Sequence, residues 1–376
     1  MNNHKVLFIS PFRDGTGYGS AALSYIEAFD NAGIDIAIRC VKYNDYQAKL
    51  KPRILELEQK SSQGCDIVIQ YTLPHAMSYN GHFKKNIAMF ESESSNFIGA
   101  NWHTHLNLMD EVWAVNKEQL QTLKNSNVTV PVKYIGHAVD TEKFQQSYPK
   151  LPIGAEDKFV FYFVGEFTRR KNFGAIIKAF HAEFGINEPV ALLFKVSIPG
   201  VSPQECAKRF TDYCIEVRKG LKLYYNIDTY HKEYVIVDRL SEEVLYSLYN
   251  ACDCFVNASR GEGWNIPCAE SAAMGKAIIS GRCGGMLDYL TDETAWLVDG
   301  CTEPCFGEID TLPELHRADE DCFEIGINGL REAMRQAFEN KELRQAKSEK
   351  CVENIFTNFN KNVIGQRAKK LLEEIA

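Results

Sequence analysis

The chain has 376 residues, of which 45% are hydrophobic and 24% charged, as in an ordinary soluble globular protein. At about 100–200 residues per domain, this length favours two domains. The 50 acidic and 42 basic side chains give a formal charge of −8, so a DNA partner is possible but not favoured. No apolar run approaches the about 18 residues that cross a bilayer, and the first residues carry no cleavage motif. We therefore expect a cytoplasmic protein without a transmembrane segment.

The 12 cysteines are scattered along the chain. The pairs Cys252/Cys254 and Cys301/Cys305 lack the two-pair, two-residue spacing of a zinc ribbon. Since no export signal accompanies them, we expect reduced and mostly buried thiols. A metal site is the less favoured alternative.

Short apolar segments alternate with helical patterns, and this alternation predicts parallel sheets covered by helices. In the first half, a helix is expected from about Ser20 to Gly33, with Ala22, Ile26 and Phe29 on one face. The strands expected in this half are Lys5–Ser10, Ile34–Cys40, Asp66–Gln70, Asn86–Phe90, Glu111–Val115 and Lys133–Ile135.

The stretch Tyr148–Gly154 carries two prolines and a glycine, which predicts a linker. Beyond it, helices are expected over Phe173–Phe184 and Glu242–Asn250. We expect an N-terminal Rossmann-like domain over 1–150, a C-terminal one over 151–355, and a last helix (356–376) that packs back on the N-terminal domain. The strands expected in the second half are Phe159–Val164, Ala191–Val196, Tyr234–Val237, Cys254–Asn257, Ala277–Ser280 and Ala295–Val298.

The most informative segment reads SRGEGWNIPCAESAAMGKAIISGRCGG, over residues 259–285. Pro267 suits the first turn of a helix, so Gly263–Ile266 precede a helix N-terminus, where unpaired N–H groups favour an anion such as a diphosphate. Glu262 and Glu270 flank this point, and carboxylates are good acceptors for the vicinal hydroxyls of a sugar or ribose. The alternative is that Glu270 only favours the helix dipole and that Glu262 is a solvated loop residue.

The run EGWNIPCAE resembles the E-x7-E segment of retaining glycosyltransferases of the GT-B fold, specifically family 4 of the glycosyltransferases. The resemblance implies that Glu262 is catalytic and contacts the transferred sugar, while Glu270 holds the nucleotide ribose. It also implies that the backbone between them approaches the sugar and diphosphate. The donor-binding residues in this stretch are Gly263, Trp264, Asn265 and Ile266. Asn265 departs from the family, which has a glycine at this position.

A second match is VGEFTRRKN, over 164–172. The family has an arginine next to the glycine and a lysine five positions further, and both neutralise the leaving nucleoside diphosphate. Lys171 stands at the lysine position, but Glu166 replaces the arginine. Arg169 or Arg170 can supply the missing charge, and we favour Arg170 because it adjoins the lysine.

The first half holds a third match, the loop Gly15–Ser20 after the first strand. Taken alone, such a loop could equally bind a dinucleotide, although its glycines do not complete the dinucleotide fingerprint. The resemblance implies that Gly17 and Tyr18 bind the donor. On the acceptor side, Glu91 ends a predicted strand and His75 follows another, so both are candidates for acceptor contacts.

We therefore expect an α/β protein of the GT-B fold, with two Rossmann-like domains facing each other across a cleft. The expected activity is retaining transfer of a sugar from a nucleotide-sugar donor to a hydroxyl of a glycan, lipid, protein or modified nucleobase. The resemblance implies no cofactor and no metal. Two alternatives stay open, namely an NAD-dependent enzyme with two Rossmann-like domains and a non-catalytic GT-B protein. A glycoside hydrolase is disfavoured because Glu262 would lie beside an anion site.

Overall fold

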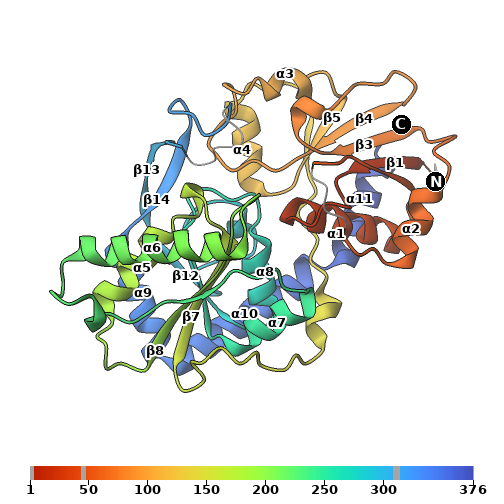
Figure 1. Cartoon of the computed structure of the whole chain (residues 1–376). Coiled ribbons are helices and arrows are strands. Elements are labelled where there is room, and N and C mark those ends of the chain that lie inside the picture. Colours follow the sequence, from red (N-terminus) through yellow and green to blue (C-terminus); the bar gives the residue numbers. More distant parts are fainter. Residues whose placement is uncertain (1–3, 44–47, 308–313, 376) are drawn as a thin grey trace. The chain divides into compact units, whose positions relative to one another are not determined.

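The computed structural model describes residues 4–43, 48–307 and 314–375 (Figure 1). The chain divides into two compact units, Met1–Lys143 with Asn354–Ala376 and Phe144–Glu353. Each unit is built on a six-stranded parallel sheet, so the expected α/β class with two Rossmann-like domains is confirmed. Among the helices of the described residues, none has the length and apolar character needed to span a bilayer.

The first unit has a parallel sheet in the order β2-β1-β3-β4-β5-β6. Its central strands are apolar runs without polar alternation because helices cover both faces, and all five residues of β3 are buried. The strand order reverses between β1 and β3, and ligands of such sheets bind at the carboxyl ends beside this switch point. The strands are β1 (Lys5–Ser10), β2 (Asp35–Cys40), β3 (Ile67–Tyr71), β4 (Lys85–Met89), β5 (Glu111–Ala114) and β6 (Val132–Tyr134).

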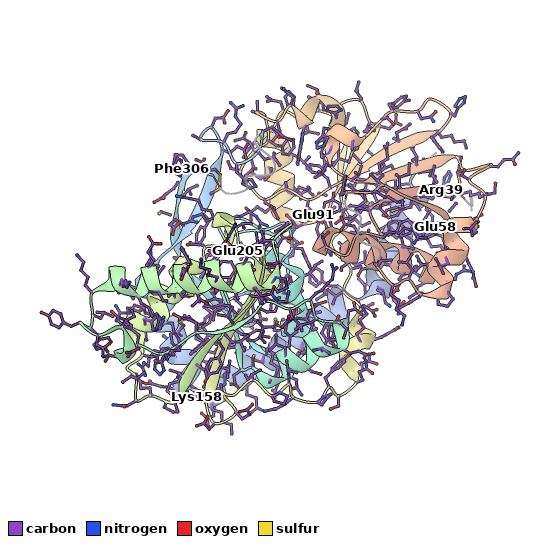
Figure 2. The ribbon with its side chains drawn as sticks, in the orientation of Figure 1. Arg39, Glu58, Glu91, Lys158, Glu205 and Phe306 are labelled. Carbon is purple, nitrogen blue, oxygen red and sulfur yellow. A yellow bond between two sulfur atoms is a disulfide. The ribbon has the colours of Figure 1, made fainter. Side chains whose placement is uncertain are left out.

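The helices of the first unit include one from the far end of the chain. In Figure 1 the blue α11 lies beside the red α1, and a methyl group at Gly365 of α11 would stand 2.1 Å from the carbonyl oxygen of Ala28 in α1. At the edge of the sheet, Arg39 of β2 donates to the carbonyl of Glu58 at 3.0 Å (Figure 2). The helices are α1 (Gly17–Asn31), α2 (Pro52–Gln59), α3 (Trp102–Leu106), α4 (Lys117–Asn125) and α11 (Lys361–Glu373). Helix α1 therefore begins three residues before the expected Ser20.

The second unit has a parallel sheet in the order β12-β11-β10-β7-β8-β9. Its switch point lies between β7 and β10, which are hydrogen-bonded neighbours. Five successive residues of β7, 160 to 164, are buried, as the apolar run FVFYFV predicts. The strands of this sheet are β7 (Phe159–Glu166), β8 (Val190–Ser197), β9 (Tyr234–Ile236), β10 (Cys254–Asn257), β11 (Ala277–Gly281) and β12 (Trp296–Val298).

Several elements of the second unit were not expected. The longest is α6 (Pro203–Leu221), whose Ser202 caps the backbone N–H of Glu205. An antiparallel hairpin follows β12 and consists of β13 (Gly300–Pro304) and β14 (Asp321–Ile325). The other helices are α5 (Phe173–Glu183), α7 (Glu242–Ala251), α8 (Ile266–Ala273) and α9 (Ile327–Glu339), and α10 (Lys341–Asn358) leads back to the first unit.

The expectation of reduced thiols is wrong at one pair, since Cys305 and Cys322 form a disulfide. The two residues are 17 positions apart, and hairpin pairing brings their Cα atoms to 5.2 Å. This pairing depends on the unexpected β13–β14 hairpin, so cysteine spacing alone could not indicate it. The other ten cysteines are free thiols.

Candidate functional site

The carboxyl edge of the second sheet brings together two loops that the sequence singles out. One follows β7 and carries a short helical turn, Arg169–Lys171, and the other follows β10 and leads into α8. Since β7 and β10 flank the switch point, both loops begin where ligands of Rossmann-like sheets bind. The backbone N–H of Arg260 donates to the carbonyl of Arg170 at 2.7 Å, which fixes one loop against the other.

Glu262 lies between the two cations that the sequence predicts. Its Oε1 is 2.5 Å from Nζ of Lys171, and its Oε2 is 3.2 Å from Nη1 of Arg170. Only 5% of Glu262 is exposed. This burial raises the pKa of its carboxyl group, but the charges of Lys171 and Arg170 outweigh it and lower the pKa to about 2. Glu262 is therefore a buried carboxylate, not the solvated loop residue of the alternative interpretation.

The backbone conformation at position 265 accounts for an asparagine where the family has a glycine. Its φ of 61° lies in the left-handed region, which glycine adopts without strain and asparagine adopts more readily than other residues. Its side-chain oxygen also accepts a hydrogen bond from the N–H of Cys268 at 3.2 Å and so caps α8. The substitution thus keeps the backbone conformation and adds a helix cap, and the first turn of α8 points its N–H groups toward the Glu262 loop.

Gly284 and Gly285 hold the backbone of Glu262 from the other side. A side chain at Gly284 would place its Cβ 2.8 Å from the carbonyl oxygen of Glu262, and the backbone φ there is 77°. The N–H of Gly285 donates to the same carbonyl at 3.0 Å. The close approach at Gly284 requires that no side chain intervene, and together with the bond from residue 285 it fixes the backbone of Glu262.

Glu270 lies in α8, and two tyrosines of α7 contact its carboxylate. The hydroxyl of Tyr246 donates to Oε1 at 3.2 Å and that of Tyr249 to Oε2 at 3.3 Å. Glu270 is half-buried, so its carboxylate is held in place and still reached by solvent. Nearby, the buried Trp264 packs against Tyr289 with ring centroids 4.8 Å apart. Gly263 is buried as well, and Ile266 is half-buried at the first position of α8.

The remaining charged residues after β7 have separate surroundings. Glu166 is exposed at the last position of the strand. Arg169 is also exposed, and its guanidinium lies over the ring of Phe306 at 4.7 Å. Arg170, by contrast, is 9% exposed and donates to the carbonyl of Gly261 at 2.6 Å. Of the two arginines considered for the missing family position, Arg170 is the one beside Glu262.

The β13–β14 hairpin reaches this loop cluster, and sequence reasoning missed that. Arg260 donates to Oε2 of Glu324 in β14 at 2.6 Å, and Asn172 donates to Oε1 of the same carboxylate at 3.1 Å. The N–H of Phe323 donates to the carbonyl of Arg260 at 2.8 Å. No motif surrounds Glu324 in the sequence, so these contacts could be found only from the fold.

The first unit gathers its predicted residues at the carboxyl edge of its own sheet. Gly17 and Tyr18 form the first turn of α1, and the ring of the half-buried Tyr18 stacks on Tyr71 at 4.7 Å between centroids. Glu91 follows β4 and accepts a hydrogen bond from Tyr71 at 2.6 Å. His137 lies 3.3 Å from the same carboxylate oxygen. Glu91 is labelled in Figure 2.

Two further residues near this edge of the sheet are His75 and Gly19. His75 is exposed in a short helical turn, with its ring 6.2 Å from that of Trp102, and no contact joins it to Glu91 among the interactions described. Gly19 is the glycine of the first loop that sterics require, because a Cβ there would stand 1.7 Å from the carbonyl oxygen of Asp14. The sequence pointed to Gly17, two positions earlier.

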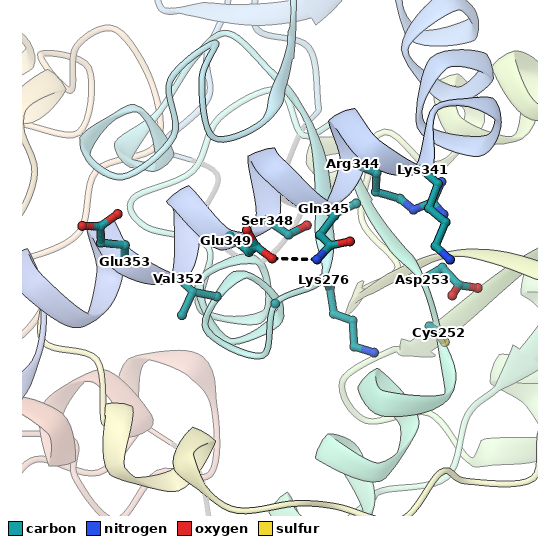
Figure 3. Close-up of a pocket in the computed structure, with 12 residues that line it drawn as sticks. Cys252, Asp253, Lys276, Lys341, Arg344, Gln345, Ser348, Glu349, Val352 and Glu353 are labelled. Carbon is teal, nitrogen blue, oxygen red and sulfur yellow. Dashed lines mark hydrogen bonds between the residues drawn. The ribbon is translucent and has the colours of Figure 1, made fainter.

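A pocket of about 570 Å³ lies at the opposite, amino edge of the second sheet (Figure 3). Asp253 immediately precedes β10, and Lys276 precedes β11. Arg344 and Gln345 of α10 line the other side. Lys276 donates to the carbonyl of Asn250 at 3.2 Å, and burial lowers the pKa of its amino group. The pocket contains none of the predicted site residues.

Comparison with known families identifies the domain that carries this site. The family model described as glycosyl transferases group 1 matches residues 158–306. The chain is therefore a glycosyltransferase. The match includes both loops at the switch point, with Lys171, Glu262 and Glu270. No curated protein matches the sequence.

Solved structures extend the likeness over both units of the glycosyltransferase. Sucrose-phosphate synthase from Thermosynechococcus elongatus aligns over 99% of both chains, with a TM-score of 0.67 and 16% identity. HepE from Anabaena, solved in complex with UDP and glucose, aligns over 99% of this chain and 100% of its own, with a TM-score of 0.66 and 13% identity. The trehalose-6-phosphate synthase OtsA aligns over 99% of this chain and 98% of its own, at a TM-score of 0.65 and 10% identity. At these identities the likeness shows the GT-B fold alone.

Proposed function

We propose that this glycosyltransferase belongs to the retaining enzymes of family 4 and moves a sugar from a nucleotide-sugar donor to an acceptor hydroxyl. The observation that carries the proposal is the buried Glu262, held by Lys171 and Arg170 beside the N-terminus of α8. One carboxylate, two cations and a helix N-terminus form a site for a sugar next to a phosphate. HepE, whose structure contains UDP and glucose, has the same fold and supports this class of donor.

The charges at the site favour a diphosphate. Lys171, Arg170 and Glu262 together carry one net positive charge in a buried place, because the carboxyl group of Glu262 stays ionised with its pKa near 2. A diphosphate that approached the two cations would compete with Glu262 for them. The carboxylate would then be released toward the hydroxyls of the transferred sugar. Lys171, Arg170 and the positive end of the α8 dipole would then balance the diphosphate without a metal ion.

We infer that Glu270 binds the ribose. Tyr246 and Tyr249 each donate to one carboxylate oxygen and so orient the half-buried carboxylate, which is a good acceptor for vicinal hydroxyls such as the 2′- and 3′-hydroxyls. The residue lies in the second turn of the helix whose N-terminus would face the diphosphate. The spacing therefore matches a nucleotide that extends along α8 from its phosphates to its ribose.

In the proposed reaction, the bond between the sugar C1 and the diphosphate oxygen breaks, and a bond from the acceptor oxygen to C1 forms on the same face. The acceptor proton passes to the departing diphosphate. Lys171, Arg170 and the α8 N-terminus stabilise the charge that develops on the leaving oxygen, which is the main contribution to catalysis. Glu91, with Tyr71 and His137 around it, is proposed to bind the acceptor, and Gly17 and Tyr18 are proposed to bind the donor.

A thermal-shift panel tests this function. UDP, ADP, GDP and their sugar conjugates are compared with NAD⁺ as the control ligand. A ligand at 100 times its Kd stabilises the protein by about 2.7 kcal/mol, so one nucleoside diphosphate and its sugar conjugate should raise the Tm clearly. The product made with the stabilising donor is then examined by NMR, and we expect its anomeric configuration to match that of the donor. Stabilisation by NAD⁺ alone, or an inverted product, would contradict the proposal.

A further inference from the structure

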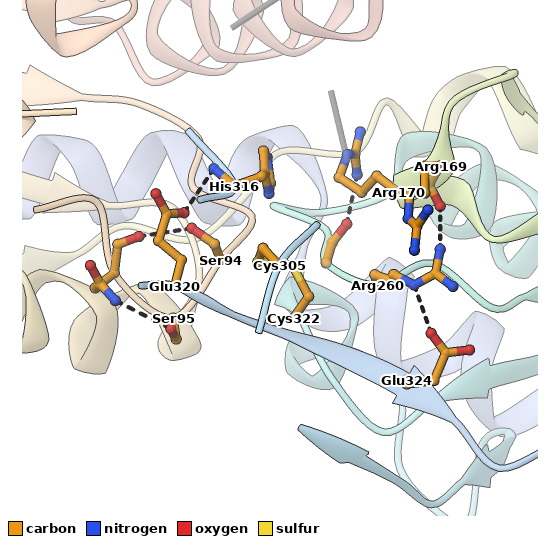
Figure 4. The surroundings of a disulfide bond; sticks show 12 residues. Ser94, Ser95, Arg169, Arg170, Arg260, Cys305, His316, Glu320, Cys322 and Glu324 are labelled. Atoms are coloured by element: carbon orange, nitrogen blue, oxygen red, sulfur yellow. Dashed lines mark hydrogen bonds and ion pairs between the residues drawn. A yellow bond between two sulfur atoms is a disulfide. The ribbon is translucent and has the colours of Figure 1, made fainter. Parts of the chain in front are cut away.

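The β13–β14 hairpin ends in a cluster of metal-ligating groups that the transfer reaction does not use. Cys305 directly follows β13, and Cys322 lies in β14 opposite Glu303. The N–H of Cys305 donates to the carbonyl of Glu320 at 2.9 Å, which closes the end of the hairpin. Figure 4 shows the two sulfur atoms with His316 beside them.

His316 is held beside the sulfurs by its backbone. Its φ of 55° is left-handed, a conformation that is uncommon outside glycine but that histidine adopts more often than most residues. The N–H of His316 donates to Oε2 of Glu320 at 3.0 Å, which fixes the turn. One imidazole nitrogen and the two sulfurs all lie within 4.8 Å of one another, and all three residues are buried.

We propose that Cys305, Cys322 and His316, with the two cysteines reduced, bind one Zn²⁺ ion. Zinc bonds to sulfur and nitrogen measure about 2.0–2.3 Å, which places tetrahedral ligand atoms about 3.5–4 Å apart, so small side-chain rotations bring all three to one ion. Two thiolates neutralise the charge of Zn²⁺, and a neutral site is compatible with burial. The three-residue set leaves the fourth tetrahedral position to water.

The disulfide and the zinc site are two states of one cysteine pair. Two molecules of a monothiol reductant, of the glutathione class, break the S–S bond and are themselves joined in a disulfide. Cys305 and Cys322 each gain one electron and one proton in this exchange. Zn²⁺ then displaces the two thiol protons, which pass to solvent.

Zinc bound at this site would stabilise the loops that follow β7 and β10. The same strand that carries Cys322 contacts Arg260 through Phe323 and Glu324. Zinc bound at the end of the hairpin would therefore stiffen a strand that supports the proposed donor site.

Metal analysis of the reduced full-length protein tests the proposal. We expect one zinc per chain, and, after replacement by Co²⁺, the absorption of thiolate-to-cobalt charge transfer. Cys305→Ser, Cys322→Ser and His316→Asn should each lower zinc affinity more than about 100-fold, since even the loss of a group that only orients a ligand costs 10- to 100-fold. Asparagine tolerates the left-handed backbone of position 316, so that variant removes the imidazole with little strain. Cys301→Ser is the matched control in the same hairpin, because Cys301 is exposed and should leave zinc binding unchanged.

Thiol chemistry on the unaltered protein gives an independent measurement. Zinc should protect Cys305 and Cys322 from alkylation, while Cys301 reacts equally with and without zinc. When the zinc-loaded protein is unfolded in chelator without reductant, all 12 thiols should titrate. A count of ten for the zinc-loaded protein would show that zinc is held without the reduced Cys305–Cys322 pair and would overturn the proposal. Failure of the reduced protein to take up zinc, or equal alkylation in both conditions, would overturn it as well.

Discussion

At the scale of single residues, Asn265 combines a backbone and a side-chain role at the start of α8. Its left-handed φ of 61° favours glycine or asparagine, and its side chain accepts the N–H of Cys268. Alanine at this position would lose the cap, at about 1 kcal/mol, and would strain the left-handed backbone by about 1–2 kcal/mol. Glycine would lose the cap without the strain. The two substitutions therefore separate the two roles.

We expect Asn265→Ala to destabilise the second unit by about 2–3 kcal/mol and Asn265→Gly by less than about 1 kcal/mol. Urea denaturation of both variants beside the parent measures the difference. Equal losses of stability in the two variants would show that the backbone conformation at residue 265 carries no strain.

The two glutamates of the site should separate binding from turnover. Glu270→Gln removes a charged acceptor that we assign to the ribose, so affinity for the nucleoside diphosphate should fall by about 1.5–3 kcal/mol, or about ten- to a hundredfold. Glu262→Gln should leave that affinity unchanged or higher, because Lys171 and Arg170 lose their internal partner, while transfer of the sugar is abolished. Calorimetric titration and a transfer assay measure the two effects.

Glu166→Gln is the matched control for these glutamate variants. Glu166 is the last residue of β7, whose loop carries Lys171. It is exposed and makes no contact with Glu262 in the described interactions. We expect its diphosphate affinity and turnover to equal those of the parent. If Glu270→Gln bound the diphosphate as tightly as Glu166→Gln does, the assignment of Glu270 to the ribose would be wrong. The role of Glu270 would then be confined to its interaction with the helix dipole.

Glu262 should also contribute a pH-dependent part of the stability. The carboxyl group has a pKa of about 2 in the folded protein, compared with 4.5 for an ordinary glutamate. Its stabilising contribution is thus fully present above about pH 4.5 and is lost as the pH falls through 2. The stability difference between the parent and Glu262→Gln should therefore shrink on acidification below pH 4.5. Urea titrations of both proteins from pH 6 to pH 3 measure it, and a difference that stays constant would contradict the lowered pKa.

At the scale of elements, the sequence predicted the strands of both sheets to within a residue or two at most ends. Buried parallel strands are continuous apolar runs bounded by turn residues, and such runs are local features. The loop residues that meet at the switch point were predicted for the same reason, since each follows a recognisable strand. Glu262 was singled out by the helix start that follows it, and its role and that of Lys171 came from the resemblance to the family, although the ion pair of the two residues is a contact across 91 positions.

The elements that sequence reasoning missed depend on non-local contacts. The β13–β14 hairpin is mostly exposed along β13, so no apolar alternation marks it. Helix α6 is polar over much of its length, with Cys206, Phe210 and Cys214 as its buried side, and this spaced pattern was not recognised. No recognisable motif surrounds His316 in the sequence. Its place beside Cys305 and Cys322 follows from the hairpin register and a left-handed turn.

Helix α11 offers a test of packing between elements. Gly365 lets α11 approach α1 so closely that a Cβ would stand 2.1 Å from a backbone oxygen, which no side-chain rotation can relieve. Gly365→Ala should therefore destabilise the first unit by about 1–3 kcal/mol. Gly220→Ala, in α6, meets no atom within 4 Å and should stabilise the second unit by about 0.5–1 kcal/mol. Denaturation followed by hydrogen exchange in each unit measures both, and equal effects would contradict the close approach of α1 and α11.

At the scale of the whole molecule, the chain builds two sheets in turn and then returns to the first. The last 23 residues, from Asn354, belong with the first unit. Lys361 at the start of α11 is 6% exposed and pairs with Glu27 and Asp140, each at 2.8 Å. The carbonyl of Ile375 lies 3.2 Å from the imidazole of His4 beside β1. The first unit therefore needs both ends of the chain, whereas the second is continuous in sequence.

This arrangement predicts that the loss of α11 affects one unit selectively. A chain that ends at residue 360 would expose the face of α1 that α11 covers and would leave Asp140 without its buried partner Lys361. Removing one member of a buried ion pair costs about 3–5 kcal/mol, which is a large part of the stability of a domain. We expect amide protection to fall in β1 to β6 and to persist in β7 to β12, as measured by hydrogen exchange and mass spectrometry. Lys361→Met in the full-length chain should produce the same pattern more weakly, because it removes only the charge. An equal fall of amide protection in both sheets would show instead that the two units unfold together. The stability of the second unit would then depend on the first.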